Sequence, residues 1–183
     1  HEGPRYPGTC RRGVTKPGTP PAVRFVFEEP SPGFEDVLCG SYPEGRAGGD
    51  FVLRRADGIW AYQLAVVVDD AEARISEVIR GEDLLSSTPR QIALYRALGY
   101  PVPRFAHVGL VVDSEGTRLA SRHQATSIQS LREAGSSPEQ VNGGLACSLG
   151  LTPTAAPIRA GELVPSFELG DIPRSSFTWN PTP

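Results

Sequence analysis

The chain has 183 residues, a net charge of −3, three cysteines and no methionine. This length is enough for one hydrophobic core. The acidic balance argues against a protein that coats nucleic acid non-specifically, but it allows a local basic face on an RNA-modifying enzyme. The sequence has no apolar run typical of a signal peptide or long enough to span a membrane.

The cysteines indicate the redox compartment of the protein, and the first residue indicates how the chain relates to the product of translation. Cys10, Cys39 and Cys147 are far apart and odd in number, which favours reduced thiols in a cytoplasm over a disulfide scaffold. Because the chain begins with His1 and contains no methionine, we expect it to be a piece of a longer protein. A processed secreted protein is the alternative.

The first region, His1 to Gly49, is rich in proline and glycine and is predicted to be a connective insertion with one strand, Val23 to Phe27. A globular α/β part then begins. Phe51 to Arg54 is predicted to be a short strand, followed by a turn with Asp-Gly chemistry at Ala56-Asp57-Gly58.

Two apolar segments follow that turn. Tyr62 to Val68 is a continuous apolar run that predicts a strand covered on both faces, ended by a turn at Asp69 and Asp70. Ile75 to Ile79 predicts a second strand, which ends at Arg80-Gly81.

Thr88-Pro89-Arg90-Gln91 has the pattern of a capping box, so a helix is predicted from Thr88 that stops at Gly99. Phe105 to Val112 predicts a further strand, and Asp113 to Gly116 a turn.

The last third is predicted to be helical. One helix covers Ser127 to Ala134, and a second capping box at Ser137-Pro138-Glu139-Gln140 starts another that reaches Leu149. The pair Gly143-Gly144 costs that helix about 1 kcal/mol per glycine, so tertiary packing must hold it. A short helix near Ala160 to Phe167 lies in the proline-rich end.

Strands that alternate with helices indicate an open, largely parallel sheet, in which ligands bind at the carboxyl ends of the strands. Arg80 follows such a strand and offers a planar fork for a carboxylate. A hydroxyl at the rim, from Tyr62, offers a second contact. On pattern alone, a surface arginine and a packed core tyrosine are the commoner roles.

The segments DFVLRRADGIWAYQLAVVVDDA and VIRGEDLLSSTPRQIALYRALG, in this order, resemble the second half of the catalytic domain of class I glutamyl-tRNA synthetases. More narrowly, they are similar to glutamyl-queuosine tRNA(Asp) synthetases, short paralogues without an anticodon-binding domain. The resemblance covers nearly the whole chain. In this family the tyrosine of AYQLA and the arginine of VIRG bind the substrate glutamate, and these positions are Tyr62 and Arg80.

The resemblance implies the fold class and its divisions. We expect an α/β fold, a partial Rossmann-like class I catalytic domain with parallel strands, followed by a small helical C-terminal part. Residues 1–49 would be the connective insertion, 50–125 the second half of the catalytic domain, and 126–183 the helical region.

A further match concerns ATP. Arg118-Leu119-Ala120-Ser121-Arg122 lies where the family carries its KMSKS-type loop, whose second lysine stabilises charge on the ATP phosphates. Ser121 replaces that lysine, and the loss of one such donor costs on the order of 10²–10³ in rate. Two interpretations stay open: a small shift of the loop brings Arg122 to the phosphates, or the loop is degenerate.

The segment Tyr6-Pro7-Gly8-Thr9-Cys10 resembles the family's Tyr-x-x-x-Cys unit, in which Tyr6 and Cys10 would be two ligands of a Zn²⁺ site. The Cys-x-Cys pair that supplies the other ligands is absent from this chain. Because a structural zinc ion normally has four ligands, the implied site is incomplete here.

The resemblance implies that the complete protein activates L-glutamate with ATP and Mg²⁺, then transfers it to queuosine in the anticodon loop of aspartate tRNA. It would be a cytoplasmic monomer. Two alternatives remain: part of an ordinary glutamyl-tRNA synthetase, or a non-catalytic remnant that keeps the fold as a binding module. The end at Thr178-Trp179-Asn180-Pro181 favours the short queuosine enzyme over the first of these.

The family's HIGH-type motif is not found between His1 and Asp50. We therefore expect the N-terminal half of the domain to be missing and this chain alone to be inactive. Half of a parallel sheet exposes a strand edge and an apolar face, so we also expect the isolated chain to aggregate.

Overall fold

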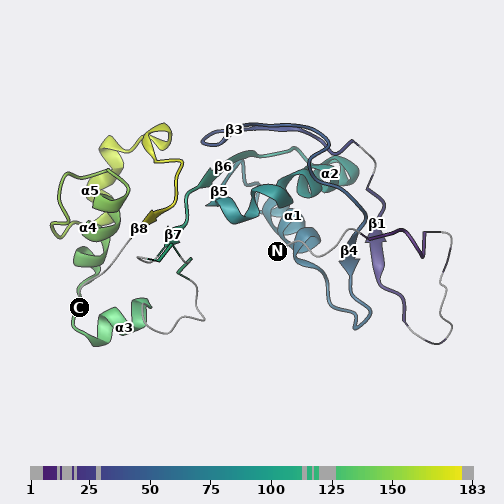
Figure 1. The fold of residues 1–183 in the computed structure, drawn as a ribbon, viewed down its shortest axis with the longest axis horizontal. Helices are drawn as coiled ribbons and strands as arrows, with labels where there is room; N and C mark the ends of the chain where they lie inside the picture. The colour runs from purple at the N-terminus through teal and green to yellow at the C-terminus, as the bar shows by residue number, and fades with distance from the viewer. Residues whose placement is uncertain are drawn as a thin grey trace. The chain divides into compact units, whose positions relative to one another are not determined.

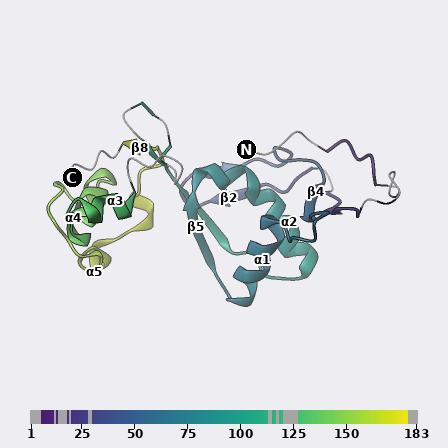
Figure 2. The same cartoon turned by 90° about the horizontal axis from the view of Figure 1, so that it is seen from below.

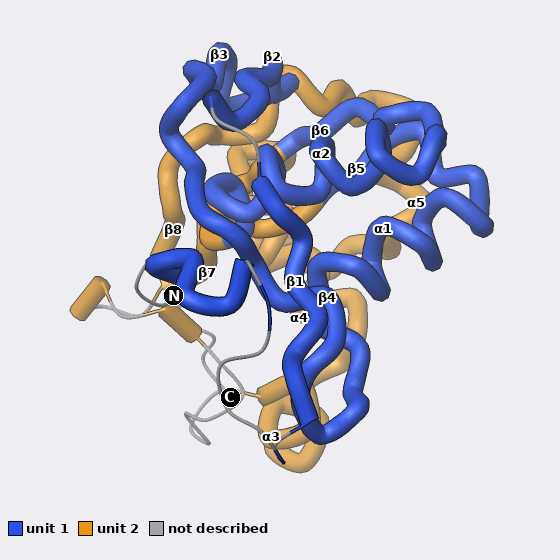
Figure 3. The backbone as a smooth tube through the Cα atoms, turned by 90° about the vertical axis from the view of Figure 1, so that its right-hand side faces the viewer, with its two compact units in different colours: residues 1–79, 84–106 blue, residues 80–83, 107–183 orange. Residues whose placement is uncertain are grey.

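The structure is a computed structural model that describes residues 6–11, 13, 18, 20–27, 30–112, 115–116, 118–119 and 127–178. The chain divides into two compact units (Figure 3). The first unit comprises His1–Ile79 and Leu84–Ala106, and the second comprises Arg80–Asp83 and His107–Pro183. Two neighbouring strands, β5 (Glu77–Gly81) and β6 (Arg104–Val108), run from the first unit into the second.

The main sheet has the strand order β3-β2-β6-β5. Strand β2 (Phe34–Asp36) is parallel to β6 and antiparallel to β3 (Gly40–Tyr42). The expected α/β fold with parallel strands is therefore confirmed. The sequence predicted neither β2 nor β3, because each has three residues and lies in a region whose proline and glycine content is typical of loops.

A second, antiparallel pair joins β1 (Val23–Phe25) to β4 (Phe51–Arg54). The predicted bounds of β4 are confirmed, whereas β1 ends two residues before the predicted Phe27. The hydrophobic core of the first unit lies between these strands and the helices beside them. Its buried members are Phe27, Phe51, Val67, Ile92, Leu94, Tyr95 and Phe105.

The predicted strand Tyr62 to Val68 is wrong, because the segment forms helix α1 (Tyr62–Glu72) (Figures 1 and 2). A seven-residue apolar run fits a buried strand and a buried helix equally well. The helix also takes in Asp69 and Asp70, for which a turn was predicted, and so reaches 11 residues. On α1 only Val67 is fully buried.

Helix α2 (Thr88–Leu98) packs against α1, and the Gln91 side-chain amide donates a hydrogen bond of 2.8 Å to Gln63 Oε1. The predicted helix and its left-handed end at Gly99 are confirmed. The predicted N-cap is wrong, because the chain enters α2 directly from the 3-10 helix η1 (Glu82–Ser87). Thr88 is already helical, and its hydroxyl donates to the Leu84 carbonyl.

In the second unit, β7 (Val111–Val112) pairs in parallel with β8 (Phe177–Thr178). The single strand predicted over Phe105 to Val112 is therefore two strands, β6 and β7, with Gly109 between them. A Cβ atom at Gly109 would overlap the carbonyl of Ser175, so this close passage of two backbones requires glycine.

The helices of the second unit confirm the helix predicted from Ser127 and the capping box predicted at Ser137. Ser127 caps α3 (Ile128–Glu133), and Ser137 caps α4 (Pro138–Ser148). The remaining helical elements are α5 (Ala160–Leu163), η2 (Val164–Ser166) and η3 (Leu169–Asp171). Gly143 is buried in α4, where a Cβ would overlap the carbonyl of Ala156, so tertiary packing explains a glycine that helix propensity disfavours.

Candidate functional site

Residues Arg80 to Asp83, at the end of β5 and the start of η1, form the centre of the candidate site. Three of their side chains each bond to a different part of the second unit. Arg80 bonds to β6, Glu82 to the segment before β8, and Asp83 to the segment after β7. We call these four residues the Arg80–Asp83 segment.

Arg80 donates a hydrogen bond of 3.0 Å from Nε to Nε2 of His107. His107 lies on β6, the strand next to β5, and its exposed fraction is 0%. Because the neighbouring strand supplies a buried acceptor, one edge of the guanidinium group is fixed. The contact ties His107 to the predicted glutamate-binding residue.

Asp83 pairs with Arg118, the first residue of the predicted KMSKS-like loop, through an N–O contact of 2.5 Å. The backbone beside Arg118 is also held, because the Leu119 amide donates to the Val111 carbonyl at 2.9 Å. Ala120, Ser121 and Arg122 lie outside the described residues. The structure thus links the first residue of the predicted phosphate loop to the segment that carries the predicted glutamate-binding arginine.

Two further contacts hold the Arg80–Asp83 segment. The Ser176 hydroxyl donates to Glu82 Oε1 at 2.8 Å and accepts from the Leu110 amide at 3.2 Å. A Cβ at Gly81 would lie 2.6 Å from Asp83 Oδ1 and 2.9 Å from Leu110 Cδ2, so a larger residue there would displace these two side chains. The Arg-Gly-Glu-Asp sequence therefore serves this local packing as well as presenting Arg80.

Tyr62 is the first residue of α1 and has an exposed fraction of 52%. The sequence placed it at the rim of a buried strand, and that setting is wrong for the reason given for α1. Tyr62 belongs to the first unit, whereas Arg80 and Arg118 belong to the second.

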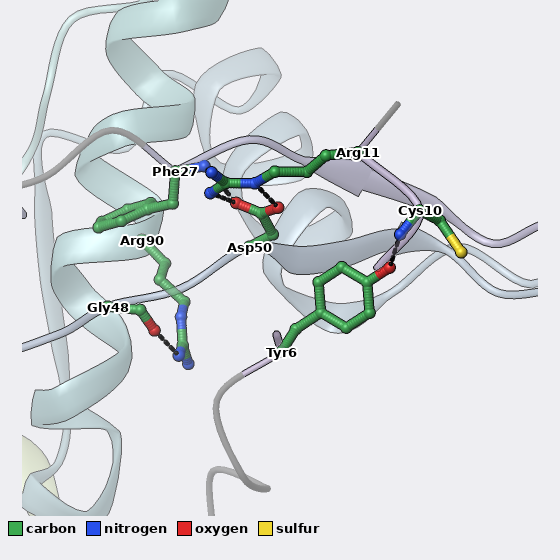
Figure 4. A network of polar contacts seen from close by, with 7 residues as sticks. All are labelled: Tyr6, Cys10, Arg11, Phe27, Gly48, Asp50 and Arg90. Atoms are coloured by element: carbon green, nitrogen blue, oxygen red, sulfur yellow. Dashed lines mark hydrogen bonds and ion pairs between the residues drawn. The ribbon is translucent and has the colours of Figure 1, made fainter. Parts of the chain in front are cut away.

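Tyr6 and Cys10, the predicted zinc ligands, lie in a short turn near the start of the chain (Figure 4). The Cys10 amide donates to the Tyr6 hydroxyl at 2.7 Å, and the Arg24 guanidinium lies 3.9 Å from the centre of the Tyr6 ring. Among the described residues, no group of three or more His, Cys, Asp or Glu side chains could hold a metal ion. That part of the chain therefore does not fit a closed zinc shell, and we assign zinc no role in the chemistry.

A buried carboxylate, which the sequence did not single out, anchors this turn to the core. Asp50 is 6% exposed and accepts from Arg11 Nε at 2.7 Å, from Arg11 Nη2 at 2.6 Å and from the Phe27 amide at 3.1 Å (Figure 4). The hydrogen bonds from Arg11 hold the pKa of the Asp50 carboxyl below its usual range. Nothing in the local sequence pairs residues 39 positions apart, so sequence reasoning had no signal for this contact.

Comparison with known proteins identifies the family to which these features belong. The family model described as "tRNA synthetases class I (E and Q), catalytic domain" matches residues 5–167. The chain belongs to this family. The recognition of a class I synthetase catalytic domain from its motifs is therefore confirmed.

Curated relatives of this class I synthetase chain carry two names. The "Glutamyl-Q tRNA(Asp) synthetase" of Symbiobacterium thermophilum is 50% identical over 182 residues, with 94% of this chain and 56% of the relative covered. The protein of the same name from Nitratidesulfovibrio vulgaris is 43% identical and is covered to the same extent, 56%. The "Glutamate--tRNA ligase" of Trichlorobacter lovleyi is 42% identical, with 97% of this chain and 39% of the relative covered.

The class I synthetase chain thus spans about half the length of the curated relatives first matched. Among solved structures, the "Glutamate-tRNA Synthetase" of Elizabethkingia anophelis aligns with a TM-score of 0.67 at 25% identity, covering 88% of this chain and 35% of that one. A glutamate tRNA ligase from Elizabethkingia meningosepticum has the same TM-score at 24% identity and supports the fold alone. No helix among the described residues is both long and apolar enough to cross a membrane.

Proposed function

We propose that this chain carries the glutamate-binding side of an aminoacyl-adenylate-forming site, with Arg80 as the contact for a glutamate carboxylate. The observation that carries the proposal is the setting of Arg80. Its guanidinium is held by buried His107 at the end of β5, in the segment that also pairs with Arg118. A fixed arginine fork is the residue type best suited to a carboxylate.

The proposal gives Tyr62 a second contact with glutamate. Its position in the AYQLA segment is the one that the family resemblance assigns to the amino acid, and its exposed fraction of 52% leaves it accessible. Both residues would act by binding and orientation, which speed adenylation without a covalent protein intermediate.

On the ATP side, the proposal gives the Arg118 to Arg122 loop the stabilisation of phosphate charge, with Mg²⁺ accompanying ATP. Arg118 already carries one ion pair with Asp83. A preorganised cation of this kind lowers the activation free energy most when it lies where negative charge develops in the transition state. The two interpretations of Ser121, a shifted Arg122 or a degenerate loop, predict different rates of adenylation and are separated by the exchange assay below.

For the complete protein we propose transfer of the activated glutamate to queuosine in aspartate tRNA. The relatives named glutamyl-Q tRNA(Asp) synthetase, at 50% and 43% identity, support this acceptor. A second candidate is the aminoacylation of glutamate tRNA, because a glutamate–tRNA ligase at 42% identity covers 97% of the chain. In either case we propose a cytoplasmic monomer, in a compartment that keeps Cys10, Cys39 and Cys147 reduced.

The test is ATP–pyrophosphate exchange with glutamate by the complete protein and its Arg80→Ala variant. Loss of a charge-assisted contact is expected to raise the KM for glutamate about 10- to 100-fold while the KM for ATP stays unchanged. Arg132→Ala, at an exposed position in α3, is the matched control and should behave as the parent. An unchanged glutamate KM in Arg80→Ala overturns the assignment.

The acceptor is tested separately, with aspartate tRNA that carries or lacks queuosine. Transfer only to the queuosine-containing tRNA supports the first candidate, and charging of glutamate tRNA at its 3′ end supports the second. A folded complete protein that shows no exchange would be the non-catalytic relative.

A further inference from the structure

We propose that His107 is a positioning residue for Arg80, one that orients the guanidinium group toward the substrate without neutralising its charge. This inference rests on the proposed function, because it concerns how Arg80 binds glutamate. His107 lies on β6, has an exposed fraction of 0% and accepts the Arg80 Nε–H at 3.0 Å.

The direction of this hydrogen bond determines the state of the imidazole ring. Arginine stays protonated in proteins and can only donate, so Nε2 of His107 must carry a lone pair. The ring is then neutral with its proton on Nδ1, the other tautomer being excluded by the bond to Arg80.

A neutral acceptor holds the Arg80 side chain without compensating its positive charge, which a carboxylate would do. A carboxylate at this position would also fix the arginine, but it would compensate the positive charge that a substrate anion needs. His107 fixes the side chain and adds no negative charge. The acidic side chains next to Arg80 in sequence have partners of their own, since Glu82 bonds to Ser176 and Asp83 to Arg118.

The contact also determines how a carboxylate can approach. A carboxylate can bind a guanidinium side-on, through Nε and one terminal nitrogen, or end-on, through both terminal nitrogens. Because His107 occupies Nε, the side-on mode through Nε is closed to a carboxylate. An unconstrained arginine side chain populates many rotamers and must give up most of them when it binds a ligand. The hydrogen bond to His107 already restricts the rotamers of Arg80, so fewer are lost when a substrate binds.

The experiment replaces His107 with three residues in the complete protein. His107→Gln places an amide oxygen near the position of Nε2, His107→Asn places it near Nδ1, beyond reach of Arg80, and His107→Leu removes the acceptor. We expect the glutamate KM to rise about tenfold in the Leu and Asn variants and to be restored in the Gln variant. The KM for ATP should not move in any of them.

Two further measurements separate positioning from general packing. In the Arg80→Ala background, His107→Leu should add nothing to the glutamate KM, because the residue through which it acts is gone. In the parent protein, ¹⁵N NMR of the imidazole should show a protonated Nδ1 and an unprotonated Nε2, a reading that needs no variant to fold.

The outcomes distinguish this inference from the proposed function. If the parent shows no glutamate-dependent exchange, the proposed function fails and this inference fails with it. If the parent is active and Arg80→Ala raises the glutamate KM, then equal KM values in the Gln, Asn and Leu variants overturn the inference alone. A proton on Nε2 in the NMR spectrum overturns it as well.

Discussion

The buried carboxylate of Asp50 gives the sharpest prediction for stability. Asp50→Asn keeps the shape of the side chain and, at Oδ1, the acceptor shared by the Phe27 amide and Arg11 Nη2, but it replaces Oδ2, which accepts from Arg11 Nε, with an NH₂ group and removes the negative charge that pairs with Arg11. Hydrogen bonds to charged groups contribute roughly 1.5–3 kcal/mol each, but the Arg11 side chain is 50% exposed and regains water. We therefore expect a loss of about 2 kcal/mol in the free energy of unfolding.

The assay is urea unfolding of the complete protein at several pH values, with thermal melting as a second measurement. For a domain of this size a loss of about 2 kcal/mol corresponds to a melting temperature lower by about 4–8 °C. The matched control is Asp57→Asn. Asp57 pairs with Arg55 on the surface and has a side chain 44% exposed, so its replacement should cost less than about 1 kcal/mol.

The pH dependence follows from the lowered pKa of Asp50 in the folded state. A carboxyl group with a depressed folded pKa contributes its stability above the unfolded value, 3.8 here, and loses it as the pH falls through the folded value. The difference between parent and Asp50→Asn should therefore be constant near neutral pH and shrink below about pH 4. A variant no less stable than Asp57→Asn at pH 7, or a difference that persists at low pH, would refute the reasoning.

Three further predictions concern other parts of the chain. Gly143→Ala should destabilise the protein by at least about 1 kcal/mol, although alanine has the better helix propensity; Gly161→Ala in α5, where a Cβ meets open space, is the control and should be neutral or stabilising in urea unfolding. Ile79, 52% exposed on edge strand β5, should promote aggregation of the isolated chain, so Ile79→Lys should lower its light scattering, and equal scattering would contradict this. Asp83→Asn frees Arg118 from a partly exposed ion pair and should change the rate of ATP–pyrophosphate exchange with a melting temperature within a few degrees of the parent; a large loss of stability at an unchanged rate would assign the pair to folding alone.

Parts of both units could be predicted from local sequence. In the second unit, the helix predicted over Ser127 to Ala134 is present as α3, and Ser137 starts α4 as its capping pattern predicts. In the first unit, Gly99 ends α2 in the left-handed conformation. These signals act within a few residues, so they do not depend on what packs against the helix. The family resemblance likewise rests on short motifs in order, and the family match confirms it.

Other elements depend on partners that the local sequence does not name. The apolar run that begins at Tyr62 is compatible with a strand or a helix, and packing against α2 accompanies the helix. Strands β2 and β3 contain three residues each, so their pairing in the sheet defines them more than their composition does.

The sequence by itself therefore determined the family, the cap of helix α4 and the identity of Arg80 and Tyr62 as candidate glutamate contacts. Only the tertiary structure decided that α1 is a helix, that His107 holds Arg80, that Asp83 holds Arg118 and that Asp50 binds Arg11. The reason is physical: capping and turn preferences are local, whereas each of those three polar contacts joins residues at least 27 positions apart. Such contacts form only when the folded backbone brings the residues together.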